Sequence, residues 1–141
     1  MTQHLLQLQN IQFAYRGNSR LVLKFFKGPF RGDVKFRGES IADKRVAELA
    51  GKIGVLFQDF ESQLFSTNAR IECAFGMENI GVDRQTMAQR IETVAKLVGV
   101  EHLLDREPQS LSGGQKQRLA LASVLCLEPQ VLLCDEPTTD L

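Results

Sequence analysis

The sequence LSGGQ at residues 111–115, followed by VLLCDEP at residues 131–137, decides the fold of this chain. Residues 115–127 are apolar on almost every side after their first turn, which predicts a buried helix. The VLLC run is a short, uninterrupted apolar segment, typical of a strand that is buried on both faces of a parallel sheet. Strands alternate with helices along the chain, and antiparallel strands are expected at its N-terminus. The sequence therefore predicts an α/β fold.

The start of this helix has an unusual composition. Ser112 and Gln115, three positions apart, form a capping box, and by itself this would indicate only an ordinary capped helix. The pair Gly113-Gly114 is not explained in this way, because each glycine in a helix costs up to ~1 kcal/mol relative to alanine. Paired glycines allow a phosphate to approach the backbone N–H groups at the positive end of the helix dipole. We interpret the segment as a helix start that faces a phosphate.

Two carboxylates follow the apolar strand directly. Asp135 and Glu136 would lie at the carboxyl end of a parallel strand, the edge of a sheet where ligands bind in α/β proteins. There Asp135 can hold Mg²⁺, directly or through water, and Glu136 can polarise an attacking water. The alternative is an ordinary turn after a strand, where acidic residues are frequent.

Together these residues resemble the ATP-binding cassette (ABC) family of transporter ATPases. In this resemblance residues 111–115 are the signature motif, residues 131–136 the Walker B strand and residues 137–141 the D-loop. The resemblance implies a P-loop NTPase-like fold with a helical signature subdomain, and ATP and Mg²⁺ as cofactors. It also implies two partners: a second ABC ATPase subunit in a head-to-tail dimer, and a transmembrane transport subunit.

The resemblance gives roles to three further residues. Gln58 corresponds to the Q-loop glutamine, which contacts Mg²⁺ and water and senses the transport subunit. Tyr15 corresponds to the aromatic residue that stacks on adenine, and Asp140 to a D-loop residue that acts across the dimer interface. From the residues alone, Gln58 would be interpreted as a surface glutamine, and Tyr15 could equally be a half-buried strand aromatic.

Other segments are similar to one branch of the family. Residues 57–65, FQDFESQLF, and residues 74–79, AFGMEN, resemble the energy-coupling-factor branch. This resemblance implies an ATP-hydrolysing subunit of an importer of a vitamin or metal ion, peripheral on the cytoplasmic face of the membrane. Residues 68–73 depart from the branch, because they lack the acidic run that usually precedes Ala-Phe-Gly.

One family element is missing. No Gly-x-x-x-x-Gly-Lys-Ser/Thr phosphate loop (Walker A) occurs in the 141 residues. A strand, phosphate loop and helix in a βαβ frame need roughly 30 residues, but only 17 residues separate Tyr15 from Asp33. We expect this unit to be absent around residues 21–24, and the chain to stop short of the family's C-terminus at Leu141. A chain of this kind would be unable to hydrolyse ATP alone. Alternatively, it is a non-catalytic module that completes the ATP site of an intact partner.

Composition sets the remaining limits. The formal net charge is zero, which gives no reason to expect nucleic acid as a partner. No apolar stretch approaches the ~20 residues that span a bilayer, and no signal peptide is evident, so we expect a cytoplasmic protein. We expect residues 1–141 to form one partial domain, made of a β-rich portion (1–57), a helical portion (58–127) and the final strand with its D-loop (128–141).

Local patterns predict the other elements. Alternation predicts strands at residues 6–8 and 11–15, with a bulge between them, and a further strand at 52–57. A hairpin is expected around residues 33–40. Apolar spacings of three and four predict a helix that starts at Asp83 and ends at Gly99, followed by a short helical stretch at 101–104.

Overall fold

The computed structural model describes residues 5–13 and 30–135. Tyr15, Glu136 and Asp140 lie outside the described residues. The chain divides into two compact units, residues 1–48 and 49–141, and each is described here by itself.

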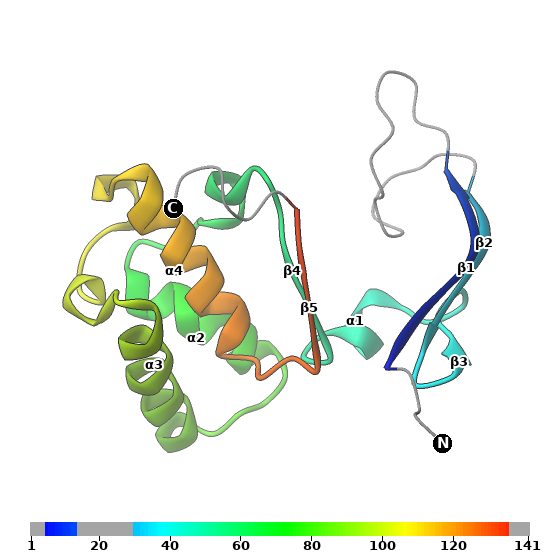
Figure 1. The fold of residues 1–141 in the computed structure, drawn as a ribbon. Coiled ribbons are helices and arrows are strands. Elements are labelled where there is room, and N and C mark those ends of the chain that lie inside the picture. The colour runs from blue at the N-terminus through cyan, green and yellow to red at the C-terminus, as the bar shows by residue number, and fades with distance from the viewer. Residues whose placement is uncertain (1–4, 14–29, 136–141) are drawn as a thin grey trace. The chain divides into compact units, whose positions relative to one another are not determined.

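The first unit contains an antiparallel sheet with the strand order β1-β2-β3 (Figure 1). Its strands are β1 (Leu6–Phe13), β2 (Phe30–Phe36) and β3 (Glu39–Ser40). The register between β1 and β2 shifts between Gln9 and Gln12, where the alternation of the sequence changes phase. The bulge predicted between two short strands is therefore confirmed, and it bends one continuous strand.

The predicted hairpin joins β2 to β3. Arg37 and Gly38 at its turn have φ angles of 53° and 83°, the left-handed pair that a two-residue hairpin turn requires. Beside the turn, the Ser40 hydroxyl donates to Asp33 Oδ1 at 2.6 Å. A short helix, α1 (Val46–Leu49), follows at the boundary between the units.

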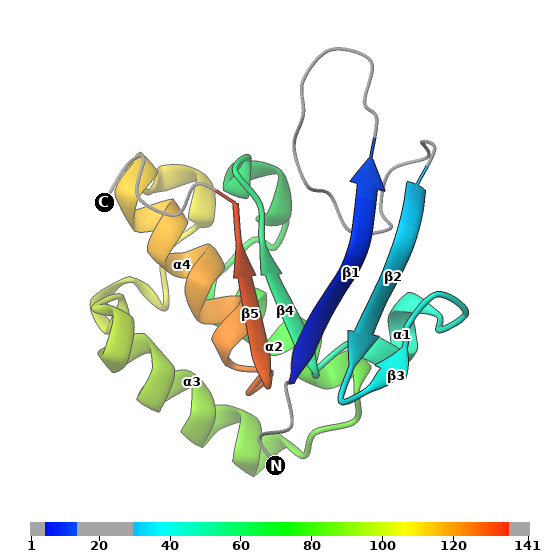
Figure 2. The ribbon, with the colours of Figure 1, turned by 45° about the vertical axis from the view of Figure 1, so that its right-hand side comes forward.

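The second unit contains a parallel strand pair. β4 (Ile53–Leu56) and β5 (Val131–Cys134) run side by side (Figure 2), with Ile53 opposite Val131. The expectation that β5 is buried on both faces was wrong, because Leu132 is 38% exposed. Among the described residues β5 pairs with β4 alone, so its other edge has no strand to cover its side chains.

Helices pack against this strand pair. The helix predicted from Asp83 to Gly99 is confirmed as α3 (Arg84–Val98): Asp83 accepts from the Thr86 N–H, and Gly99 ends the helix with a φ of 74°. The stretch predicted at 101–104 is a single 3₁₀ turn. The remaining helical elements are α2 (Ala69–Asn79), α4 (Gly113–Leu125), and the 3₁₀ turns η1 (Phe60–Gln63), η2 (Glu101–Leu103) and η3 (Pro108–Ser110).

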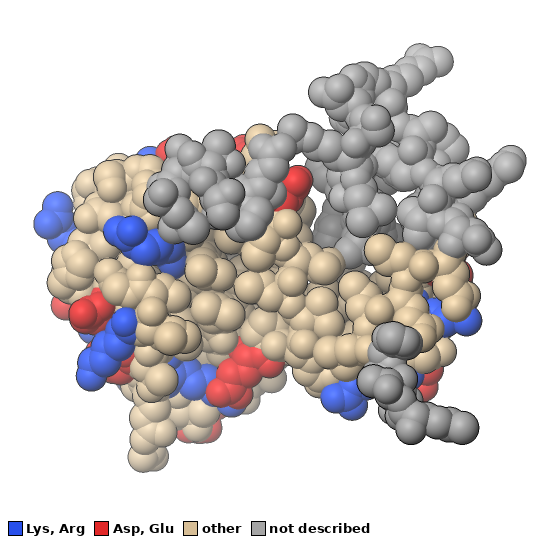
Figure 3. Space-filling model, in the orientation of Figure 1, with Lys and Arg blue, Asp and Glu red and all other residues tan. Residues whose placement is uncertain are grey.

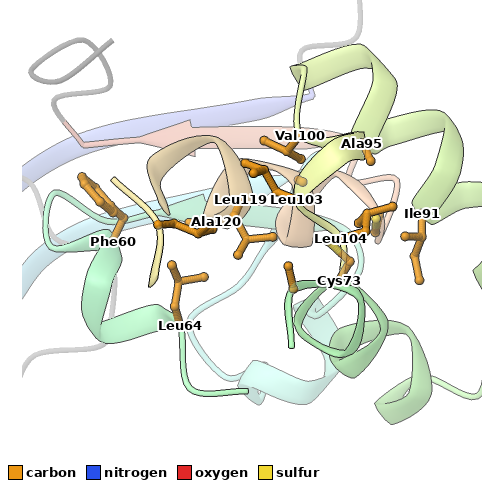
Figure 4. Close-up of a cluster of buried hydrophobic side chains, with 14 of the residues drawn as sticks. Phe60, Leu64, Cys73, Ile91, Ala95, Val100, Leu103, Leu104, Leu119 and Ala120 are labelled. Atoms are coloured by element: carbon orange, nitrogen blue, oxygen red, sulfur yellow. The ribbon is translucent and has the colours of Figure 1, made fainter. Parts of the chain in front are cut away.

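The hydrophobic core of the second unit lies where α2, α3 and η2 meet α4 (Figure 4). Helix α4 contributes Leu119, Ala120 and Ala122, all at most 1% exposed. Small alanines allow α4 to approach its neighbours closely, while Leu119 fills the space between them. The core therefore holds α4, and with it the LSGGQ segment, in a fixed position relative to β4.

Candidate functional site

The carboxyl ends of β4 and β5 bring two predicted site residues to the same edge of the sheet. Leu56 lies opposite Cys134, and the Asp135 N–H donates to the Leu56 carbonyl at 2.9 Å. Asp135 follows β5 directly, and Gln58 follows β4 by two residues, so both leave the sheet at this edge. Both are exposed, and their oxygens are of the kind that Mg²⁺ prefers.

The loop after β4 is held by its own side chains. The Gln63 amide accepts from the Phe57 N–H at 3.1 Å and donates to the Val55 carbonyl at 3.2 Å, as a neighbouring strand would. Asp59 caps η1, because its carboxylate accepts from the Ser62 N–H at 3.4 Å. Its carbonyl also accepts from the Ser62 hydroxyl at 2.8 Å. Sequence reasoning missed the role of Gln63. These bonds fix the path of the loop that carries Gln58.

The start of α4 is capped as predicted. The Ser112 N–H donates to Gln115 Oε1 at 3.0 Å, in the geometry of a capping box, and the Lys116 N–H donates to the Ser112 carbonyl at 2.8 Å. Gly113 is exposed, and a methyl group added there would meet no described atom within 4 Å beyond its own helix. Packing against the described residues therefore does not explain why this position is glycine.

An ion pair joins the start of α4 to the loop after β4. Lys116 Nζ lies 3.2 Å from Glu61 Oε1, and both residues line a small pocket of about 110 Å³ together with Leu64, Pro108 and Gln109. Lys116 is mostly buried, with 19% of its side chain exposed. The contact ties the Gln58 loop to the LSGGQ segment, so the two predicted site segments are neighbours in the second unit.

The charge around these segments is mixed. On the face in Figure 3, basic and acidic side chains both occur and do not separate into regions of one sign. Within the described part of the chain, no three His, Cys, Asp or Glu side chains form a group that could hold a metal ion. The described residues thus offer oxygen donors from Gln58 and Asp135, but not a complete metal site.

A hydrophobic surface lies next to the Gln58 loop, and sequence reasoning missed it. The rings of Phe65 and Phe75 pack edge to face, with centroids 4.7 Å apart, yet the two residues are 59% and 43% exposed. Ile71, one turn before Phe75 on α2, is 52% exposed. We call Phe65, Ile71 and Phe75 the aromatic surface. The sequence signal for this surface was the pair Ile71 and Phe75, which are four positions apart on the face of α2 that does not pack into the core.

A buried carboxylate supports this surface. Glu72 is 4% exposed and accepts from the Phe65 N–H at 3.1 Å and the Ser66 N–H at 2.8 Å. The two bonds satisfy the charge that burial would otherwise penalise. They hold Phe65 in place beside α2.

The geometry defines a class of protein. Gln58 and Asp135 follow the two strands of a parallel pair. The capped Gly-Gly start of α4 is joined by an ion pair to the loop that carries Gln58. This arrangement is expected for an ABC-type ATPase domain. The family profile for the ABC transporter matches residues 20–139, and the chain belongs to this family.

Curated relatives of this chain include members of one branch of the family. The energy-coupling factor transporter ATP-binding protein EcfA of Methanoculleus marisnigri is 38% identical over 149 residues, which cover 95% of this chain and 54% of the relative. EcfA1 of Halalkalibacterium halodurans is 48% identical over 112 residues, covering 79% of this chain and 40% of the relative. The chain spans about half, or less, of the length of the curated relatives it matches.

The alignment with EcfA of Methanoculleus marisnigri is longer than this chain. It extends over 149 residues although this chain has 141 in total. The relative therefore has residues within the matched span for which this chain has no counterpart. This agrees with the internal gap that the sequence predicts.

A solved structure shares the fold. CbiO1 of Clostridium perfringens, part of the ABC transporter complex CbiONQ, superposes with a TM-score of 0.71 at 37% identity, covering 83% of this chain and 47% of CbiO1. The predicted α/β fold of the ABC ATPase type is thereby confirmed. In the regions 5–13 and 30–135, no helix is long and apolar enough to cross a membrane.

Proposed function

We propose that this chain is part of the ATP-binding subunit of an energy-coupling-factor type importer, one that takes up a vitamin or a metal ion. The observation that carries the proposal is the open, capped start of α4, where Gly113 faces no described atom of its own chain. The similarity to EcfA proteins and to CbiO1 supports the importer class.

The proposed roles follow from the chemistry of phosphate and magnesium. When bound, ATP with Mg²⁺ would supply the phosphoryl group and the charge that neutralises it. Ser112, Gly113, Gly114 and Gln115 would hold phosphate oxygens of a nucleotide bound to the second cassette, at the positive end of α4. Asp135 and Gln58 would provide metal ligands, and Glu136 would orient water. Tyr15 would stack on adenine, and Asp140 would act across the dimer.

The chain lacks a phosphate loop for its own nucleotide. In the family that loop supplies backbone N–H donors, a lysine and one Mg²⁺ ligand, and none of the 141 residues forms its sequence. We therefore propose that this chain does not hydrolyse ATP by itself. Isothermal titration with Mg-ATP tests this: we expect no binding in the micromolar range, and micromolar affinity would overturn the proposal.

A second function is favoured by the same helix start. The chain could act as a non-catalytic module whose residues 112–115 complete the ATP site of an intact cassette, in a head-to-tail pair. Gly113 is exposed, and no packing contact with the described residues requires glycine there, which suits a residue that faces a ligand held by another chain. We expect the chain to raise the ATPase rate of an intact EcfA-type subunit.

A matched pair of variants tests the module. Ser112→Arg places a long cation at the helix start and should abolish the stimulation. Lys96→Ala changes a charge at the other end of the helical region, in the last turn of α3, and should leave the stimulation unchanged. If both variants stimulate like the original chain, the helix start does not act on a partner's nucleotide.

The transmembrane partner would dock on the aromatic surface. Phe65, Ile71 and Phe75 expose apolar side chains next to the Gln58 loop, and aromatic residues are enriched in protein interfaces. Docking there would place the chain on the cytoplasmic face of the membrane. Phe65→Ser with Phe75→Ser should abolish co-purification with the transport subunit, whereas Leu97→Ser, at an exposed leucine on α3, should not.

A further inference from the structure

The ion pair between Glu61 and Lys116 joins two segments that are distant in the sequence. Lys116 Nζ lies 3.2 Å from Glu61 Oε1, and 19% of the Lys116 side chain is exposed, against 58% for Glu61. Lys116 directly follows Gln115, the last residue of the LSGGQ segment, and Glu61 lies in η1, three residues after Gln58. The pair therefore connects the start of α4 to the loop that carries Gln58.

The backbones on both sides of this pair are anchored in the core. Phe60 and Leu64, which flank Glu61, are each 8% exposed and belong to the main hydrophobic cluster. On α4, Leu119 lies three residues after Lys116 and is 1% exposed in the same cluster. Because packing already fixes both backbones, the ion pair orders only two side chains. The entropy cost that makes many exposed pairs weak is smaller in this case.

Lys116 also closes the first turn of α4 through its backbone. Its N–H donates to the Ser112 carbonyl at 2.8 Å, while its Nζ contacts Glu61 on the neighbouring loop. One residue thus contributes to the helix start and to the contact with the loop. A displacement of Glu61 is therefore transmitted to the turn formed by residues 112–116.

The pair also determines where the charge of Lys116 is used. A cation directly after the LSGGQ segment suggests a contact with phosphate, which lysine binds as a point charge. However, the Lys116 ammonium lies against the Glu61 carboxylate, in the pocket that Leu64, Pro108 and Gln109 also line. A phosphate that approached this ammonium would be repelled by the carboxylate. The geometry therefore favours a role for Lys116 in positioning the helix over a role as a phosphate ligand.

We propose that Lys116 is a positioning residue, whose ion pair with Glu61 holds the first turn of α4 at a fixed place relative to the Gln58 loop. The pair thereby sets where residues 112–115 meet a nucleotide bound to a partner cassette. This inference rests on the proposed role of residues 112–115 at that nucleotide. It adds that the position of the Gln58 loop controls how well the helix start performs this role.

Amide hydrogen exchange in the full chain measures this coupling without a partner. The Arg118 N–H, which bonds to the Gly114 carbonyl within the helix, reports opening of the start of α4. The Ala95 N–H, on the buried face of α3, reports opening of the whole unit. Glu61→Gln and Lys116→Gln should each lower the protection of Arg118 relative to Ala95 by about 2- to 5-fold, as expected for a partly exposed pair. The double variant should lose no more than the larger single effect, because both substitutions remove the same contact.

Stimulation of an intact EcfA-type subunit then separates positioning from phosphate contact. Glu61→Gln removes the pair but leaves the Lys116 cation without this carboxylate. If Lys116 positions α4, Glu61→Gln should lower the stimulation as much as Lys116→Gln does, whereas Lys116→Arg, which can still pair with Glu61, should keep it. If Lys116 binds phosphate directly, Glu61→Gln should preserve or raise the stimulation, and this result would overturn the proposal.

A matched control and the contrary outcomes complete the design. Glu78→Gln removes a carboxylate from an exposed position on α2 and should change neither exchange nor stimulation. If the protection of Arg118 is the same in the original chain and the pair variants, or if Arg118 and Ala95 lose protection equally, the pair does not position the helix start and the proposal is wrong. If the exchange coupling is present but the original chain does not stimulate a cassette, the proposed module fails while the coupling between the loop and α4 is supported.

Discussion

Two glycines of the second unit differ in whether packing requires them. At Gly54 on β4, an added Cβ would lie 2.5 Å from Val124 Cγ1 and 3.1 Å from Pro129 Cγ, so this glycine is required by packing against α4. At Gly113 an added Cβ meets no described atom within 4 Å beyond its helix. Among the described residues, packing thus requires glycine at position 54 but not at position 113.

Alanine substitutions at Gly54 and Gly113 should affect different properties: the stability of the chain in the first case and the stimulation of an intact cassette in the second. We expect Gly54→Ala to lower the free energy of unfolding by about 1–3 kcal/mol, through overpacking. Gly113→Ala should leave stability unchanged or raise it by up to ~1 kcal/mol, because alanine favours the helix, while reducing the stimulation of an intact cassette. Urea denaturation and the ATPase assay measure the two effects. A destabilised Gly113→Ala chain would mean that this glycine has a structural role.

The cap of α3 should make stability depend on pH. Hydrogen bonds from the Thr86 side chain and from its N–H, the latter 3.0 Å long, lower the pKa of Asp83. Because the folded-state pKa lies below the unfolded value, the cap's contribution is complete above the unfolded pKa and is lost as the pH falls through the folded pKa. Asp83→Ala should therefore lower the melting temperature more at pH 7 than at pH 3.

Asp83→Asn is the matched control for this cap. Asparagine also accepts a hydrogen bond at the helix start, so Asp83→Asn should keep most of the stability at pH 7 but without the dependence on acid. The difference in melting temperature between each variant and the original chain isolates Asp83 from the other carboxylates. Equal differences at pH 7 and pH 3 for Asp83→Ala would contradict the expected linkage.

At the scale of elements, a helix was predicted correctly where its cap, its apolar period and its terminal glycine all indicated the same bounds. Helix α3 has a capping Asp83, a periodic apolar face and a terminal Gly99, and it was predicted within a residue. Helix α2 was missed, although Ala69, Cys73 and Met77 recur every four residues on its buried face. Its opposite face carries the exposed apolar residues Ile71 and Phe75, which removes the contrast on which the helical pattern depends.

Other features depend on contacts that no local pattern contains. The apolar run of β5 predicted burial on both faces, but burial depends on neighbouring strands, and within the described regions β5 has one. The position of Asp135 at the carboxyl end of its strand followed from the general rule for parallel sheets, whereas Gln58 was predicted from the family resemblance. The Gln63 bonds did not follow, because a side chain that replaces a strand depends on the path of the loop.

The two hydrogen bonds that the Gln63 side chain makes beside β4 should contribute to stability. Gln63→Met keeps the length of the side chain but removes its bonds to the Phe57 N–H and the Val55 carbonyl. Since both bonds are only partly buried, we expect a loss of about 1–2 kcal/mol in the free energy of unfolding, near the low end for unsatisfied groups. Chemical denaturation measures it.

Gln63→Glu refines this test. The carboxylate can still accept from the Phe57 N–H, but it cannot donate to the Val55 carbonyl and places negative charge beside it. We expect this variant to be less stable than the original chain at pH 7 and to recover partly in acid, where a protonated carboxyl can donate. If both variants are as stable as the original chain, the Gln63 bonds do not hold the loop.

On the scale of the whole molecule, the main cluster of buried side chains among the described residues lies in one unit. Each buried residue of the main hydrophobic cluster lies between Leu56 and Cys126, within the unit formed by residues 49–141. Because burial of apolar surface is the main favourable term in folding, this unit should carry most of the stability of the chain. A chain shortened to residues 49–141 should therefore unfold in one cooperative thermal transition, close in temperature to the main transition of the full chain.

This shortened chain also tests whether the absent phosphate-loop unit prevents folding. Its fold would rest on α4 held between α2, α3 and β4, and none of these contacts involves residues before position 49. Circular dichroism should give a sigmoidal melt, and Leu119→Ala, in the centre of this core, should lower its midpoint through a loss of about 2–5 kcal/mol. A gradual melt that Leu119→Ala does not shift would mean that residues 49–141 need the first unit, or another chain, to form a packed core.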